Sequence, residues 1–92
     1  MKSDRFEWDD TKAASNLSKH EVSFDDACRA VDDPHAIEYL QDDVAEERTL
    51  IVGTAEGRVL AVVYTERGTH RRIISARKAT KGEQDDYFTQ RH

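Results

Sequence analysis

Residues 49–78 read TLIVGTAEGRVLAVVYTERGTHRRIISARK, and the architecture follows from this stretch more than from any other. Three runs within it are rich in Val, Ile, Leu and Thr, which favour strands: 49–54, 59–65 and 72–78. Glu56-Gly57 and Arg67-Gly68-Thr69 separate the runs and supply turn residues. The pattern therefore predicts an antiparallel meander of three strands.

The sequence before the meander predicts a short strand followed by a helix. Residues 4–8 fit a strand that places Phe6 and Trp8 on one face. Asp9 is a suitable N-cap for a helix over 10–19, and Trp8 and Ala13 have the spacing of a hydrophobic staple. Ala13 and Leu17 form the narrow apolar stripe by which this helix is expected to pack.

A second helix follows, with Ser23 as its N-cap. Its apolar positions have the spacing of one buried helix face: Phe24, Ala27, Cys28 and Val31. Pro34 helps to stop it, residues 36–41 fit a short strand, and residues 41–47 read as a polar loop. At the other end of the chain, Thr80 and Glu83 have the spacing of a capping box that opens a C-terminal helix.

These elements predict one α+β domain over residues 1–92. A short N-terminal strand and two helices pack on the antiparallel meander, and a helix follows it. No apolar run is long enough for a membrane helix, and the first residues lead into no signal-peptide core. Cys28 is the only cysteine, which excludes an internal disulfide and favours a cytoplasmic protein.

Charge is distributed unevenly along the chain. Residues 1–47 contain 5 Lys or Arg and 14 Asp or Glu, for a net charge of −9, whereas residues 48–92 carry +4. The overall charge of −5 argues against general affinity for nucleic acids. We therefore expect a polyanion to meet the C-terminal half and a basic partner to meet the acidic half.

The sequence contains none of the common metal or cofactor motifs. No two of the four histidines, His20, His35, His70 and His92, have the spacing of metal ligands, and the acidic doublets do not form a calcium loop. There is no glycine-rich phosphate loop and no serine paired with a base at recognisable spacing. We therefore expect neither a metal ion nor an organic cofactor.

Arginines in the strands are the first candidates for a functional site, and there are four of them: Arg48, Arg58, Arg72 and Arg77. Alternation along the last strand puts Ile73, Ser75 and Arg77 on one face and Arg72, Ile74 and Ala76 on the other. Arg77 lies deep in an otherwise mostly apolar run, where its planar fork suits a phosphate group. The alternative is a surface arginine or a structural ion pair with Glu83.

Four further side chains could transfer protons. Lys19 and His20 end the first helix. Histidine exchanges protons near neutral pH, and a neighbouring lysine stabilises an anion. The alternative is that this basic pair only caps the C-terminal end of the helix. Glu83 and Tyr87 lie one turn apart on the last helix and could face the sheet together. Each has a structural alternative, Glu83 in the capping box and Tyr87 in core packing.

Two blocks of the sequence resemble the BrnT toxin family. The first contains Phe6-Glu7-Trp8-Asp9, Lys12, Asn16, Lys19-His20, Val22 and Phe24. The second contains Gly57-Arg58, Val62-Val63-Tyr64, Arg72-Ile73-Ile74-Ser75-Ala76-Arg77, Ala79, Glu83 and Tyr87. The order and separation of both blocks fit the family over nearly the whole chain.

The resemblance implies a function that spacing alone does not. BrnT proteins are the toxins of bacterial type II toxin–antitoxin pairs; they are RelE-like in fold, cleave RNA without a metal and inhibit translation. Their antitoxin, BrnA, has a ribbon-helix-helix DNA-binding domain, so the toxin meets DNA only indirectly, through the complex that represses its own operon.

The expected reaction is attack of the ribose 2′-hydroxyl on the adjacent phosphate, which requires a base, a proton donor and positive charge on the phosphate. Arg77 would bind the phosphate, with Arg72, Arg58 or Arg48 as further RNA contacts. Lys19, His20, Glu83 and Tyr87 remain alternatives for proton transfer. A different class of function also fits the composition: a non-catalytic module that binds a basic partner protein through its acidic half.

Overall fold

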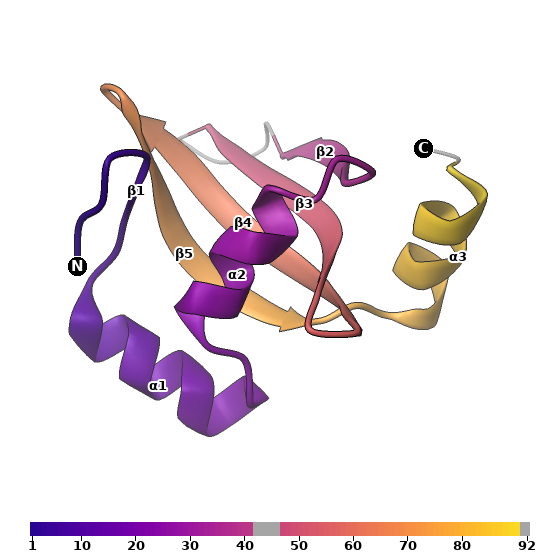
Figure 1. Ribbon diagram of the computed structural model, residues 1–92, viewed down its shortest axis with the longest axis horizontal. Coiled ribbons are helices and arrows are strands. Elements are labelled where there is room, and N and C mark those ends of the chain that lie inside the picture. The colour runs from indigo at the N-terminus through magenta and orange to yellow at the C-terminus, as the bar shows by residue number, and fades with distance from the viewer. Residues whose placement is uncertain (42–46, 91–92) are drawn as a thin grey trace.

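A computed structural model describes residues 1–41 and 47–90 of the chain (Figure 1). The elements are β1 (Phe6–Glu7), α1 (Asp10–His20), α2 (Phe24–Val31), β2 (Ile37–Gln41), β3 (Arg48–Ala55), β4 (Arg58–Arg67), β5 (His70–Lys78) and α3 (Lys81–Thr89). The strands form one sheet in the order β1-β5-β4-β3-β2. The predicted α+β architecture is confirmed, and residues 42–46 of the predicted polar loop lie outside the described residues. No helix in the described ranges is long and apolar enough to cross a membrane.

The helix starts predicted from capping residues are confirmed. The Asp9 carboxylate accepts hydrogen bonds from the backbone N–H groups of Thr11 and Lys12, at 2.8 and 3.1 Å. Ser23 caps α2, and Thr80 with Glu83 forms both bonds of the capping box at α3. In each case a side-chain oxygen satisfies N–H groups that the first turn leaves without partners.

The hairpin between β3 and β4 closes at the predicted turn. Glu56 and Gly57 both have positive φ, 51° and 76°, and Ala55 pairs with Arg58 on either side of them. Two central residues with positive φ are the mark of a type I′ turn, whose twist matches that of the flanking strands. The turn therefore fixes the register of β3 against β4.

The position of β1 in the sheet is a feature that the sequence did not predict. This strand pairs in parallel with β5, Phe6 with Arg71 and Glu7 with Arg72, and then ends. The remainder of β5 therefore forms an open sheet edge among the described residues. The helix α1 lies alongside this edge (Figure 1).

The two faces of the sheet are covered by different helices. On one, which we call the α2 face, α2 packs on a core that includes Phe24, Leu60 and Val62. A Cβ atom at Gly53 would lie 2.2 Å from the Ala30 carbonyl oxygen, so only glycine permits α2 to approach β3 this closely. The opposite face, which we call the α3 face, carries a smaller apolar cluster that α3 covers in part: Ile37, Leu50, Val52, Ala61, Ala79 and Tyr87.

The predicted apolar stripe of α1 is wrong in one of its two members. Ala13 packs against the core, but Leu17 is 51% exposed and points away from it. The residue that α1 buries is Asn16, at 7% exposure. Hydrogen bonds to the sheet edge orient this helix in place of an apolar stripe.

Strict alternation along β5 is also wrong. The register shifts where Val63 and Tyr64 of β4 face β5, because Tyr64 pairs with Ile73 whereas Val63 pairs with Ser75. Ile74 is the extra residue of a β-bulge, and a bulge exchanges the faces of all residues beyond it. Ile73 and Ala76 consequently share the core of the α2 face.

Candidate functional site

The bulge in β5 brings two of the candidate arginines to the same face of the sheet. Arg77 pairs with Ala61, whose side chain belongs to the cluster on the α3 face. Arg72 pairs with Thr65, which alternation along β4 puts on that face too. Arg72 and Arg77 are five positions apart, so without the bulge they would lie on opposite faces of the sheet. Ser75 lies between them on the same face.

Arg77 and Glu83 form a two-pronged ion pair. The Arg77 Nη1 and Nη2 atoms donate to the two carboxylate oxygens of Glu83 at 2.7 and 3.0 Å. This contact lowers the pKa of the Glu83 carboxyl, which also accepts from the Thr80 backbone N–H at 2.8 Å. Guanidinium has five N–H donors, so the pair leaves Arg77 donors for a second anion. With 40% of the side chain exposed, those donors can reach one.

The other candidate arginines have different surroundings. Arg72 donates to Glu7 at 2.7 Å, a bond that lowers the pKa of that carboxyl. Arg58 lies on the α2 face, where it contacts Asp26 at 3.2 Å and the Glu21 carbonyl at 2.9 Å. The structure therefore separates Arg58 from Arg72 and Arg77.

Arg48 precedes Leu50 by two residues in β3, so alternation places it on the α3 face. Its Nε atom is buried and has no hydrogen-bond partner within residues 1–41 and 47–90. Three of the four candidate arginines thus share one face of the sheet.

Lys19 and His20 line a shallow hollow between α1 and the open edge of β5. The residues around it are Lys12, Ser15, Asn16, Lys19, His20, Ile74 and Ser75. Ser75 is two residues before Arg77 in β5, a separation of roughly 7 Å along a strand. The hollow therefore brings the end of α1 close to the strand that carries Arg77.

Asn16 fixes this arrangement. Its Nδ2 atom donates to the carbonyls of Ala76 and Val22 at 2.8 and 3.0 Å, and its Oδ1 atom accepts from the Ala76 N–H at 3.1 Å. The side-chain amide thus occupies the place that a further strand would take beside Ala76. A buried amide with these three bonds holds α1 against the sheet edge.

Tyr87 belongs to a separate hydrogen-bonded group beneath α3. Its hydroxyl donates to Asp33 at 2.5 Å, and Thr54 donates to the same carboxylate through its backbone N–H and its hydroxyl, both at 2.9 Å. Burial raises the pKa of Asp33, but the bonds from Tyr87, the His35 N–H and Thr54 outweigh it and lower the pKa to about 2. Burial and Asp33 together raise the pKa of Tyr87, so its phenol keeps its proton.

The surroundings of Cys28 keep its thiol protonated. Burial, followed by Asp25 and Asp32, raises the pKa of the Cys28 thiol to about 12, which keeps the thiolate scarce. Within the described part of the chain, no group of three or more His, Cys, Asp or Glu side chains is arranged to hold a metal ion.

Sequence reasoning overlooked the structural parts of the site. Asn16 had one signal, because asparagine is unfavourable inside a helix and needs a reason to be there. Asp33 had none, because its partners Thr54 and Tyr87 are 21 and 54 residues away. Both residues act through long-range contacts that only the folded chain reveals.

Comparison with protein families identifies a match over most of the chain. A family model described as "Ribonuclease toxin, BrnT, of type II toxin-antitoxin system" matches residues 8–83. This range contains α1 and α2, the whole meander and the Arg77–Glu83 pair. No curated protein matches the chain.

Proposed function

Because the chain belongs to the BrnT family of ribonuclease toxins of type II toxin–antitoxin systems, we propose that it cleaves RNA without a metal ion. In this reaction the ribose 2′-oxygen forms a bond to the adjacent phosphorus and the bond to the 5′-oxygen breaks. A base takes the proton of the 2′-hydroxyl, and an acid gives a proton to the leaving 5′-oxygen. The products are a 2′,3′-cyclic phosphate and a 5′-hydroxyl.

One observation carries the proposal: side chains able to exchange protons share the β5 edge with a cationic fork. Lys19 and His20 line the hollow together with Ser75, and Arg77 follows on the same strand. A scissile phosphate at the end of the hollow would lie between the two groups. RNA supplies the nucleophile, so the protein needs to supply only proton transfer and positive charge.

Arg77 is the group that we assign to the phosphate. Glu83 holds the guanidinium in one orientation, and a fixed donor stabilises a developing charge without reorganising. Arg72 and Arg48 on the same face are suited to neighbouring RNA contacts. Arg58 is less suited because it lies on the opposite face.

The surroundings of the four proton-transfer candidates favour Lys19 and His20. Glu83 is already engaged by Arg77 and Thr80, which keeps it ionised and its oxygens occupied. Tyr87 is 8% exposed, and its hydroxyl donates a hydrogen bond to Asp33. We therefore assign both proton transfers to His20, which takes the proton of the 2′-hydroxyl and returns it to the leaving 5′-oxygen. Lys19 stabilises the anionic phosphate, and Glu83 positions Arg77.

Membership of a type II system implies an antitoxin partner. We propose that it is a BrnA-type ribbon-helix-helix protein, that cleavage by the free toxin inhibits translation in the cytoplasm, and that DNA is met only through the complex. The acidic half of the chain is the surface that we assign to a basic segment of the antitoxin.

A second candidate function is a non-catalytic module that binds a basic protein partner. The observation in its favour is that Arg58, Arg72 and Arg77 all contact carboxylates, as sheet arginines with a purely structural role would. On that account, Arg77 would serve only to join α3 to the sheet.

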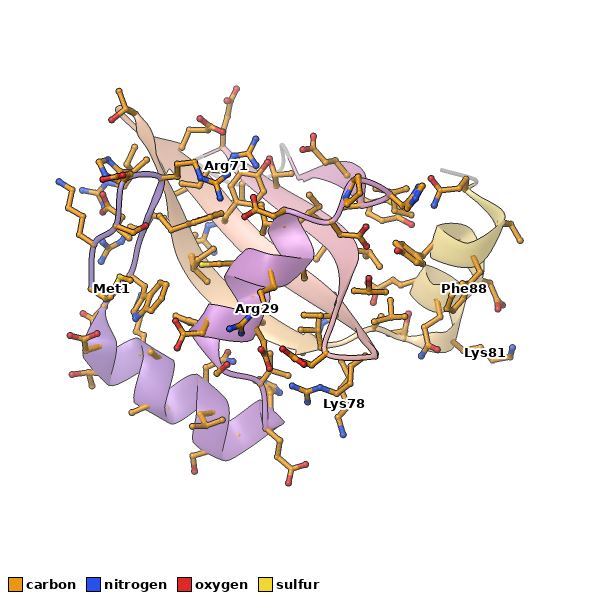
Figure 2. All side chains as sticks on the ribbon, in the orientation of Figure 1. Met1, Arg29, Arg71, Lys78, Lys81 and Phe88 are labelled. Carbon is orange, nitrogen blue, oxygen red and sulfur yellow. The ribbon has the colours of Figure 1, made fainter. Side chains whose placement is uncertain are left out.

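Comparing Arg77→Lys with Arg29→Lys separates the two functions. Arg29 lies on the solvent side of α2 and pairs with Asp26, so it is a matched arginine away from the β5 edge (Figure 2). Lysine keeps the charge at position 77 but loses the fork. We expect Arg77→Lys to lose about 2–4 kcal/mol of transition-state stabilisation, roughly 30- to 900-fold in cleavage rate.

Thermal melting accompanies the rate measurement. The Arg77–Glu83 pair is partly exposed, so Arg77→Lys should cost about 1 kcal/mol of stability or less. Arg29→Lys should cleave at the wild-type rate. If Arg77→Lys melts like the wild type and cleaves RNA equally fast, Arg77 does not bind the scissile phosphate.

A further inference from the structure

The face that α1 turns toward the sheet edge is polar, which is unusual for a surface helix. Lys12, Ser15 and Lys19 line the hollow and share one side of the helix by their spacing. Leu17, a large apolar side chain, points outward instead. An amphipathic helix normally packs its apolar side against the body of the protein.

Asn16 is the cause of this orientation. Its three hydrogen bonds to Val22 and Ala76 fix the rotation of α1 about its axis. The lysines one turn before and one turn after Asn16 are thereby held over the hollow. The positions of these two lysines are therefore set by Asn16, which is buried and uses both of its amide N–H groups in hydrogen bonds.

The lining of the hollow has positive charge and no negative charge. Its lining contains Lys12, Lys19 and His20 but no carboxylate. Over residues 1–41 and 47–90, neither lysine forms an ion pair, whereas Lys78 and Lys81 do. In a chain with a net charge of −5, two lysines without ion pairs beside one hollow favour an anionic ligand.

The dimensions suit a length of backbone rather than a single ion. Lys12 and Lys19 are seven residues apart in α1, a distance of about 10 Å along the axis. Ser15 and Ser75 add hydroxyl groups between and opposite them. A groove with charges at intervals and hydroxyls beside them is typical of sites that follow a single-stranded phosphodiester chain.

We infer that the hollow between α1 and β5 binds the RNA backbone beside the scissile phosphate, and that Lys12 binds a flanking phosphate there. The inference rests on the proposed function and assigns Lys12 to substrate binding alone. Lys12 lies two turns from His20 and takes no part in proton transfer.

The test compares Lys12→Gln with Lys81→Gln, which changes an exposed lysine on α3 away from the hollow. Binding of a single-stranded RNA that carries 2′-O-methyl groups, and so is not cleaved, is measured over a range of salt concentrations. We expect Lys12→Gln to weaken binding by about 3- to 10-fold at low salt and to reduce the slope of log K against log salt by about 0.7. For cleavable RNA, KM should rise with kcat nearly unchanged. Lys81→Gln should change neither quantity.

The outcomes distinguish this inference from the proposed function. If the wild type cleaves RNA and Lys12→Gln has the wild-type affinity and salt slope, the inference is wrong and the function stands. If the wild type binds RNA without cleaving it and Lys12→Gln lowers the slope, the binding site stands and the ribonuclease proposal fails. An equal loss in Lys81→Gln would also overturn the inference, because the effect would then be one of general charge. Melting curves confirm that each variant is folded.

Discussion

Asn16 shows at the scale of one residue how a side chain can replace a strand. Its amide satisfies both the N–H and the carbonyl of Ala76 on an edge that β1 leaves open. An aspartate has the same shape and can still accept from the N–H, but it cannot donate to the Ala76 and Val22 carbonyls. We expect Asn16→Asp to lower the free energy of unfolding by about 2–4 kcal/mol.

Urea unfolding measures this change, with Ser15→Ala as the control on the same helix. The control should stay within about 0.5 kcal/mol of the wild type, because Ser15 is exposed. If Asn16→Asp proved as stable as Ser15→Ala, the Asn16 amide would not stabilise the sheet edge in the place of a strand.

The residues that could be predicted from sequence are those whose partners are local. Asp9, Ser23 and Thr80 cap helices through groups two or three residues away, and each was predicted correctly. Asn16 contacts a residue 60 positions distant, and no local pattern identifies that partner. Leu17 is expected in the apolar stripe because it follows Ala13 by one helical turn, and that spacing takes no account of the sheet edge.

At the scale of an element, α3 is held to the sheet mainly by hydrogen bonds. Tyr87 donates to Asp33, Tyr39 donates to Asp86 at 2.8 Å, and Arg77 donates to Glu83. Few apolar side chains of α3 are buried; Phe88 is 69% exposed (Figure 2). A nine-residue helix has little stability of its own, so these bonds determine whether it stays docked.

The Asp33 bonds give α3 a stability that depends on pH. The folded-state pKa of Asp33, about 2, lies below the ordinary aspartate value near 3.9. The stabilisation is therefore complete above about pH 4 and is lost as the pH falls from there toward 2. We expect Asp33→Asn to be less stable than the wild type by about 1–3 kcal/mol at neutral pH, and the difference to shrink over that acidic range.

Asp85→Asn on the same helix is the control, because Asp85 is exposed and pairs only with Lys81 among the described residues. A difference between the wild type and Asp33→Asn that stayed constant from pH 7 to pH 2 would rule out the charged Asp33 as its source.

Prediction of whole elements succeeded better than prediction of their faces. The three meander strands and the turn at Glu56-Gly57 follow from composition. The faces of β5 do not, because a single bulge residue depends on how β4 and β5 pair. That residue decides whether Arg72 and Arg77 share a face of the sheet, so this part of the site could not be predicted from the sequence pattern.

At the scale of the whole molecule, charge separates the chain into two parts. The N-terminal half carries −9, and exposed carboxylates such as Asp10 and Glu21 lie on and beside α1. We expect association with a basic antitoxin to be accelerated by this surface and to slow as salt increases. Stopped-flow association rates at low and high salt measure the effect; equal rates would mean that apolar contacts alone bring the partners together.

The most direct test of the proposed function is cleavage of single-stranded RNA by the purified protein in excess EDTA. We expect cleavage that leaves 2′,3′-cyclic phosphate and 5′-hydroxyl ends, and no cleavage where a 2′-deoxynucleotide replaces the ribose at the cut site. A folded protein that leaves RNA intact, that cuts only after a divalent metal is added, or that cuts at the 2′-deoxy position would contradict it.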